Sequence, residues 1–319
     1  TKGDGKVDIL YALEKIRTPF WNGVMSAVTQ LGGEVIFIVA AVVVFWCVSK
    51  WEGYYLMTIA FCGTVLNQFL KLICRVPRPW VRDPNFTIVE SARAEATGYS
   101  FPSGHTQNAV GTFGGIARAT KRHCLRWVCV VIFVLVSFSR MYLGVHTPLD
   151  VGVSFGIGLV LVFALYPLFR DIDSHPKRLY LLFGAMAVLG AAYLLFAELW
   201  PFPADVDAAN LASGRKNAYT LLGAVLGMTF AYWLDRRYVH FDVRAVWWAQ
   251  VLKTVLGLAI TIGLRAALKA PLLALCGGHN VANLIRYALM VIFAAGIWPM
   301  TFGWFGRLGR KKPASGASD

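Results

Sequence analysis

The chain of 319 residues is 57% hydrophobic and only 15% charged, and its mean hydropathy is +0.57. A soluble domain of this size carries about 25% charged residues, so the composition excludes an ordinary soluble domain. The net charge is +14, from 31 basic and 17 acidic residues. We do not expect a nucleic-acid partner on that account, because the basic residues of membrane proteins collect in cytoplasmic loops.

The N-terminal region, residues 1–33, is predicted to lie at or partly within the membrane surface. Its segment 8–17 places its apolar side chains on one helical face, which is typical of an interfacial helix. These side chains are Ile9, Leu10, Leu13 and Ile16. The next stretch, 19–33, is apolar but short and contains Asn22 and Gln30, so a re-entrant helix and a thin span both remain open.

Nine longer apolar stretches are predicted to be transmembrane helices, since they approach the roughly 20 residues that cross a bilayer. They lie at 34–49, 54–73, 105–120, 126–143, 148–169, 179–198, 218–235, 246–265 and 284–305. The predicted fold class is therefore all-α, a polytopic bundle of membrane helices. Six cysteines show neither metal nor disulfide spacing, and we expect them to be buried free thiols.

Basic residues predict the orientation of this bundle. Four connections that fall on one side of the predicted spans are rich in Lys and Arg, which makes that side cytoplasmic by the positive-inside rule. They contain Arg118, Lys121, Arg122 and Arg126; Arg170, Lys177 and Arg178; Arg236, Arg237 and Arg244; and Arg307, Arg310, Lys311 and Lys312. The C-terminus is then cytoplasmic, and the loops at 74–104 and 144–147 are extracytoplasmic.

Three polar segments in these extracytoplasmic loops carry the chemistry. They run from Lys71 to Pro79, from Pro102 to His105 and from Ser139 to Asp150, and each lies at the end of an apolar run. If the three ends meet on one side of the membrane, they bring together cations, two imidazoles, one carboxylate and a Gly-containing turn. That combination suits displacement at phosphorus.

Three cations are the candidate phosphate ligands: Lys71, Arg78 and Arg140. Arginine offers a planar fork that matches phosphate oxygens, and lysine offers a point charge. Arg78 lies between two prolines, which holds it in an extended turn. A cation at a helix end more often reaches for the lipid headgroups, but three of them beside histidines favour a binding site.

The other two segments place histidines beside predicted helix starts. Ser103 is expected to cap a helix whose free N–H groups face an anion, and Gly104 lets the backbone come close. Asp150 follows His146 by four residues, so its carboxylate can accept the Nδ1–H of His146 and leave Nε2 as a nucleophile. At each of these two helix starts, the simpler alternative is an ordinary capped helix without a binding role. His105 argues against this alternative at the start that Ser103 caps.

Together, Lys-x6-Arg-Pro, Pro-Ser-Gly-His and Ser-Arg-x5-His-x3-Asp resemble the three-part signature of the type 2 phosphatidic acid phosphatase (PAP2) superfamily, over roughly residues 20–170. The resemblance implies a six-element helical core, here with about four additional C-terminal helices. It also implies hydrolysis without a metal or another cofactor. His146 would attack phosphorus, Asp150 would orient it, and His105 would act as acid and then base. The phosphate would be held by Lys71, Arg78, Ser103, Gly104 and Arg140.

The expected partition is an N-terminal region at 1–33, a catalytic core at 34–174, and additional membrane helices with a basic tail at 175–319. The expected substrate is a membrane lipid with a phosphate monoester or diphosphate headgroup, hydrolysed at the extracytoplasmic face of a bacterial inner membrane. A phosphotransferase with the same site, and a lipid carrier or scramblase that uses the second half, are the alternatives. The lipid and the homo-oligomeric state stay open.

Overall fold

The computed structural model describes residues 5–308, and every regular element in that range is helical. The longer helices are α1 (Gly5–Lys15), α2 (Pro19–Gln30), α3 (Glu34–Val43), α4 (Lys50–Cys74), α8 (His123–Tyr142), α9 (Pro148–Phe169), α10 (Lys177–Leu199), α11 (Ala208–Leu234), α12 (Trp247–Ala267) and α14 (Val281–Ile292). The shorter ones are α5 (Pro79–Arg82), α6 (Gly104–Ala109), α7 (Gly115–Ala119), α13 (Lys269–Leu275) and α15 (Phe302–Phe305). The prediction of an all-α fold is confirmed for the described residues.

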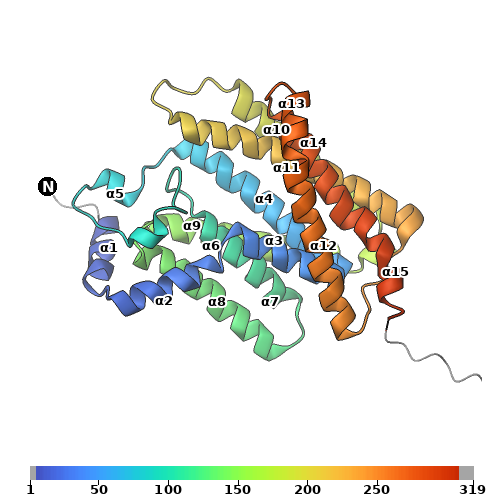
Figure 1. Cartoon of the computed structure of the whole chain (residues 1–319). Helices are drawn as coiled ribbons and strands as arrows, with labels where there is room; N and C mark the ends of the chain where they lie inside the picture. Colours follow the sequence, from blue (N-terminus) through green and yellow to red (C-terminus); the bar gives the residue numbers. More distant parts are fainter. Residues whose placement is uncertain (1–4, 309–319) are drawn as a thin grey trace, which may run out of the picture.

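Helix α4 lies between the two halves of the chain (Figure 1). It packs against α9 on one side and against α10 and α11 on the other. The fully buried ring of Tyr54 on α4 contacts Phe45, Phe183 and Tyr232, with ring centroids 5.0, 5.6 and 5.8 Å away. These rings come from both halves, so the two halves share one apolar core.

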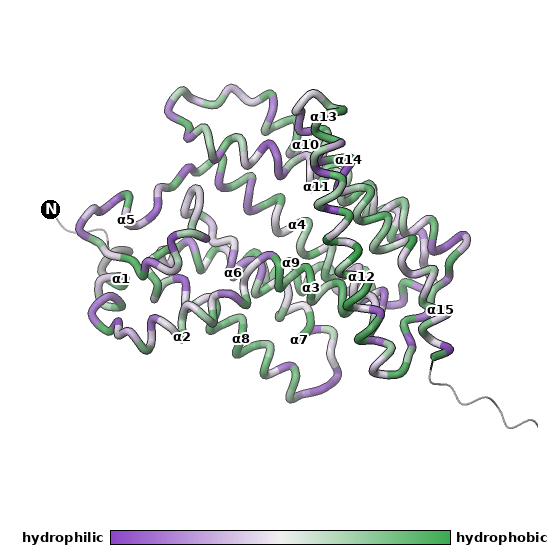
Figure 2. The backbone as a smooth tube through the Cα atoms, viewed as in Figure 1, coloured by the Kyte–Doolittle hydropathy of each residue, from purple (hydrophilic) through white to green (hydrophobic). Residues whose placement is uncertain are grey.

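Six helices of the described chain are long and apolar enough to cross a membrane, or seven if the bent pair of α2 and α3 is one span. In Figure 2 the long helices are mostly green along their length, whereas the loops carry most of the purple. The structure contains a helix at each of the nine predicted stretches, but fewer of them meet the criteria for a span. The division into six core helices and four extra helices is not confirmed.

The predicted stretches that do not qualify as membrane spans are too short, too polar or bent. The helix over residues 104–119 is shorter than the roughly 20 residues that a span needs, and a π-helical turn at Val110–Gly114 interrupts it. Helix α11 is long, but it carries Arg215, Lys216 and Asn217 in its first half. Helix α3 ends in a π-helical turn and meets α2 at an angle of 47°.

Helix α1 covers most of the segment 8–17 that is predicted to lie in the membrane surface. Of the apolar side chains at residues 9–16, only Leu10 is buried, in a cluster with Phe86. Ile9 and Ile16 are 50% and 58% exposed on the protein surface. The cysteine prediction is only partly correct: all six are free, but only Cys129 is buried, while three are half-buried (Cys47, Cys62 and Cys276) and two are exposed (Cys74 and Cys124). Most of the predicted basic tail lies outside the described residues.

The helix starts that carry the motif residues form as predicted. The hydroxyl of Ser103 accepts the N–H of Thr106 at the start of α6. At the start of α9, Thr147 and Asp150 form a reciprocal capping box, with Pro148 as the first helical residue. These caps fix where α6 and α9 begin and therefore where His105 and His146 lie.

The second half is held together by unusually close packing of α11 against α14. Gly223 and Gly227 lie one turn apart on α11, and a Cβ atom at these positions would lie 2.1 Å from the carbonyl oxygen of Leu284 and 2.6 Å from that of Ala288. Small residues four apart let membrane helices approach at backbone distance, where van der Waals contact drives their association. The pair Gly223 and Gly227 therefore positions α11.

We expect Gly223→Ala to destabilise the protein by about 1–3 kcal/mol, because the new methyl group would overlap backbone that cannot move away. The measurement is the Tm of the detergent-purified protein. Gly263→Ala on α12 is the matched control, since no atom lies within 4 Å of the position that its new methyl group would take. An unchanged Tm in Gly223→Ala would contradict the close packing of α11 and α14.

Candidate active site

The three motif segments meet around one cavity of about 250 Å³. The C-terminal end of α4 brings Lys71, the N-terminus of α6 brings His105, and the connection between α8 and α9 brings His146. Six of the eight predicted site residues line the cavity: Lys71, Arg78, Gly104, His105, Arg140 and His146. The sequence prediction that these chain segments converge is therefore confirmed.

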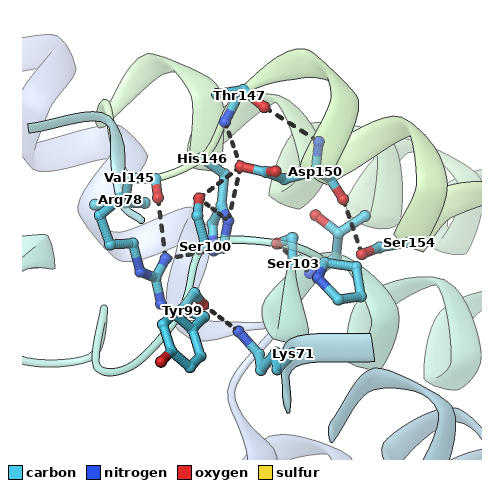
Figure 3. A network of polar contacts seen from close by, with 12 residues as sticks. Lys71, Arg78, Tyr99, Ser100, Ser103, Val145, His146, Thr147, Asp150 and Ser154 are labelled. Carbon is cyan, nitrogen blue, oxygen red and sulfur yellow. Dashed lines mark hydrogen bonds and ion pairs between the residues drawn. The ribbon is translucent and has the colours of Figure 1, made fainter. Parts of the chain in front are cut away.

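His146 is almost completely buried, and its two ring nitrogens face different groups (Figure 3). Its Nε2 lies 2.9 Å from Nη1 of Arg78, and its Nδ1 lies 3.6 Å from Oδ2 of Asp150. Burial lowers the pKa of His146 well below its ordinary value, and the charges of Arg78 and Arg140 lower it further. The ring is therefore neutral at pH 7. Its Nε2 accepts from Arg78, which places the proton on Nδ1.

Asp150 is held by more groups than the sequence suggests. Its Oδ2 accepts the N–H of Thr147 at 2.8 Å and the hydroxyl of Ser100 at 2.6 Å. The distance of 3.6 Å to His146 is too long for the direct hydrogen bond that we predicted. Ser100 also lies 3.5 Å from Nδ1 of His146, so its hydroxyl is in contact with both members of the pair. Sequence reasoning missed Ser100, because nothing in its local pattern indicates a partner 50 residues away.

Residues 97–99 hold two of the cations through backbone carbonyls. Arg78 donates to the carbonyls of Thr97 at 2.7 Å and Gly98 at 2.9 Å, and Lys71 donates to that of Tyr99 at 2.5 Å. Arg78 has the extended backbone expected between two prolines, with φ −64° and ψ 154°. The 97–99 segment thus fixes both side chains without neutralising either of them, since carbonyl oxygens carry no formal charge.

Arg140 is fully buried and approaches the cavity from α8. Its Nη1 donates to the hydroxyl of Thr29 on α2 at 2.7 Å, while its Nε and Nη2 have no hydrogen-bond partner in the structure. A buried guanidinium with unused donors is costly unless a ligand supplies acceptors. Thr29 is a second residue that the sequence did not indicate, although it lies in the N-terminal region whose topology was open.

His105 pairs with an acidic residue of the long loop. Its Nε2 lies 3.0 Å from Oε2 of Glu95, and the His105 side chain keeps 17% of its surface exposed. Glu95 lies in the predicted extracytoplasmic loop 74–104 but belongs to none of the three motif segments. In the structure this loop lines the cavity through Glu95 and the 97–99 segment.

The two other predicted site residues of the Pro-Ser-Gly-His segment, Ser103 and Gly104, have different surroundings. Ser103 is fully buried, and its hydroxyl accepts the N–H of Thr106 on its own helix rather than facing the cavity. Its own N–H donates to the carbonyl of Asp150 at 3.2 Å, which ties α6 to α9. Gly104 lines the cavity, and no atom lies within 4 Å of where its Cβ would be. Backbone N–H groups at this turn are therefore accessible to a ligand.

Three cations around the cavity lack ion-pair partners. Lys71, Arg78 and Arg140 all line it, and within residues 5–308 none of them forms an ion pair. The carboxylates of Glu34 and Glu95 also line the cavity, but neither lies within ion-pair distance of these cations, so the three positive charges favour an anionic ligand. Across the same residues, no three His, Cys, Asp or Glu side chains lie together as metal ligands would.

The second half of the chain also contributes to the cavity. Asn210 and Ser213 of α11 line it together with Glu34 at the start of α3 and with Asn67 and Gln68 of α4. None of these five was predicted from the sequence, because they belong to no motif and come from distant elements. Their convergence depends on α4, which packs against both halves.

Comparisons with known proteins agree with this site. The family model of the PAP2 superfamily matches residues 51–173, and a second model, described as "PAP2 superfamily phosphatase, transmembrane extension", matches residues 219–311. Phosphatidylglycerophosphatase B of Bacillus subtilis is 30% identical over 178 residues, which are 51% of this chain and 80% of that protein. Undecaprenyl-diphosphatase BcrC of the same species is 31% identical over 41% of this chain and 67% of that protein.

A probable sphingosine-1-phosphate phosphatase of Dictyostelium discoideum is 27% identical over 73% of this chain, but the match spans only 58% of that protein. Among solved structures, a PAP2-type phosphatidylglycerolphosphate phosphatase from Bacillus subtilis matches with a TM-score of 0.45 and 30% identity, over 53% of this chain and 86% of the other. The chain therefore belongs to the PAP2 superfamily of membrane lipid phosphatases and carries that superfamily's transmembrane extension.

Proposed function

We propose that this protein hydrolyses the phosphate monoester or diphosphate headgroup of a membrane lipid through a phosphohistidine on His146. The observation that carries the proposal is the set of three cations that line the cavity without ion pairs in residues 5–308, two of them buried (Arg78 and Arg140), around a neutral histidine. A phosphate monoester carries about −1.5 to −2 charges at pH 7, which matches what this site lacks. The substrates named for the related proteins are lipid phosphates and diphosphates of this kind.

In the first step, Nε2 of His146 attacks phosphorus, a P–N bond forms, and the bond from phosphorus to the leaving oxygen breaks. The leaving alkoxide takes a proton from protonated His105. In the structure, Arg78 donates a hydrogen bond to Nε2 of His146. An entering phosphate has to accept this hydrogen bond from Arg78 instead, which frees the Nε2 lone pair for attack. Arg140 supplies the unused donors for the non-bridging oxygens, where negative charge increases in the transition state.

In the second step, His105 removes a proton from water as the water oxygen attacks phosphorus. The P–N bond breaks, and inorganic phosphate leaves a neutral His146. Asp150 stabilises the positive charge that the imidazole ring acquires while it carries the phosphoryl group. Burial and then the charge of Arg140 lower the pKa of His105 to about 4, although Glu95, at 3.0 Å, favours the protonated form. The negative charge of a bound phosphate raises this pKa and so favours the protonated His105 that the first step requires. No step in this scheme uses a metal ion.

The proposed location is a bacterial inner membrane, with the site facing the periplasm and the C-terminus in the cytoplasm. The proposal rests on the four basic connections and on the positive-inside rule. Within the chain, we propose that residues 34–174 supply the chemistry and that residues 1–33 and 175–319 complete the walls. Thr29, Asn210 and Ser213 support this division, since they touch or line the site from outside the core.

The detergent-purified protein is expected to release inorganic phosphate from at least one of phosphatidate, phosphatidylglycerol phosphate, undecaprenyl diphosphate and sphingosine phosphate. The release should persist in EDTA and fall by at least about 10³-fold in His146→Ala, because this variant lacks the nucleophile.

His123→Ala is the matched control, since that histidine starts α8 outside the cavity, and its release should equal that of the wild type. Failure of the folded wild type to release phosphate from any of the four lipids would contradict hydrolysis. Transfer of the phosphoryl group to an added alcohol, detected as a new phosphoester, would instead support a phosphotransferase.

Ser100→Ala is expected to lower kcat about 10- to 100-fold with little change in KM. The lost hydrogen bond is charge-assisted and worth about 1.5–3 kcal/mol, and it positions Asp150 rather than the substrate. Ser100→Thr should restore most of the activity, because it keeps a hydroxyl. The control is Ser154→Ala, whose hydroxyl donates to the backbone carbonyl of Asp150 and not to its carboxylate. Equal losses in both alanine variants would show that Ser100 acts only through general stability.

A further inference from the structure

The first turns of α11 line the active-site cavity although they lie outside both regions matched by family models. These regions end at residue 173 and begin again at residue 219, whereas Asn210 and Ser213 lie between them. The two residues are three apart and therefore share one face of the helix. Close packing of Gly223 and Gly227 against α14 holds this helix in place further along.

Contacts with the 97–99 segment bring Asn210 beside the phosphate-binding cations. The backbone N–H of Asp207 donates to the hydroxyl of Tyr99 at 3.2 Å. A Cβ at Gly98 would lie 2.5 Å from Oδ1 of Asn210, and Gly98 has a φ of +71°, which L residues rarely adopt. The carbonyl of Gly98 in turn accepts from Arg78. Asn210 is thus separated from Arg78 by a single backbone unit.

The side chains of Asn210 and Ser213 have no hydrogen-bond partner within residues 5–308, and the same holds for Gln68 of α4. All three line the cavity, and each offers both donors and acceptors without a formal charge. Such groups bind hydroxyl groups well but contribute no charge to balance a second phosphate. Unused polar groups in a cavity are also costly if a bound ligand leaves them unpaired.

Acidic residues on the same cavity disfavour a second phosphate further. Glu34 and Glu95 both line it, and only Glu95 has a cationic partner, His105. The cavity of about 250 Å³ is many times the roughly 10–15 Å³ that one water molecule needs on the same measure, so a single phosphate group does not fill it. Space therefore remains for a small group next to the phosphate, and the groups around this space suit hydroxyls.

We propose that Asn210 and Ser213 are specificity-determining residues that bind a free hydroxyl on the alcohol esterified by the phosphate. The preferred substrates would be lipid phosphates whose phosphate sits on a glycerol or sugar with an unsubstituted hydroxyl. The proposal rests on the proposed phosphatase function and adds to it the part of the substrate that the start of α11 recognises. It gives the helices after residue 174 a role in selecting the headgroup.

The test compares two phosphate monoesters in mixed micelles. Phosphatidylglycerol phosphate carries a free hydroxyl beside its phosphate, and phosphatidate does not. For the first lipid, Asn210→Ala and Ser213→Ala should each lower kcat/KM about three- to tenfold, mainly through KM, because each removes one hydrogen bond. For phosphatidate both variants should match the wild type. Asn217→Ala is the matched control, since Asn217 lies on α11 but does not line the cavity.

Equal losses on both lipids would overturn the proposal, because Asn210 would then only support the 97–99 segment. Unchanged kcat/KM on both lipids would overturn it as well. A binding measurement separates this failure from failure of the phosphatase function. We expect sn-glycerol 3-phosphate to raise the Tm of the wild type more than inorganic phosphate does at equal concentration, and the Asn210→Ala, Ser213→Ala double variant to lose this difference. Headgroup recognition is overturned if the wild type responds equally to both ligands, whether or not it hydrolyses lipids.

Discussion

The active site depends on three cations that line one cavity and form no ion pair in residues 5–308. Lys71, Arg78 and Arg140 are brought to the end of the bundle and are held there by backbone carbonyls and one threonine hydroxyl. Neutral acceptors fix the positions of these side chains but leave their charge to be balanced by a ligand. Burial keeps the pKa of His146 low, and the same positive charges lower it further, so that Nε2 stays unprotonated. The cations therefore contribute both to ligand affinity and to the state of the nucleophile.

This arrangement makes the active site a product of the whole chain rather than of its motifs alone. Helix α4 carries Lys71 and also Tyr54, whose ring joins aromatic side chains of both halves. The 97–99 segment holds two cations on one side and contacts the start of α11 on the other. A displacement of α11 would consequently reach Arg78 and Lys71 through this segment. We interpret the start of α11 as a wall of the site, which links the second half of the chain to the catalytic residues.

Sequence reasoning predicted what local patterns can specify. The helical class, the caps at Ser103 and Thr147, and the extended backbone of Arg78 follow from nearest-neighbour chemistry, and the structure confirms them. Pairings between distant residues could not be predicted in this way, as with Ser100 and Asp150. The direct bond from Asp150 to His146 was wrong at 3.6 Å, because two other donors already hold the carboxylate. The predicted number of spans is not confirmed, because only six or seven stretches of the described residues are long and apolar enough to cross a membrane.

The measurement that tests the central claim most directly is detection of the covalent intermediate. The wild type and His105→Ala would be mixed with a lipid phosphate substrate, quenched within milliseconds under alkaline conditions and analysed by peptide mass spectrometry. Our account predicts a phosphoryl group on the peptide that contains His146. For a substrate whose leaving group needs no proton, our account also predicts that phosphorylated His146 accumulates more in His105→Ala than in the wild type. The variant lacks the base that activates the attacking water. Turnover without any phosphorylated His146, or with the phosphoryl group on another residue, would contradict the account.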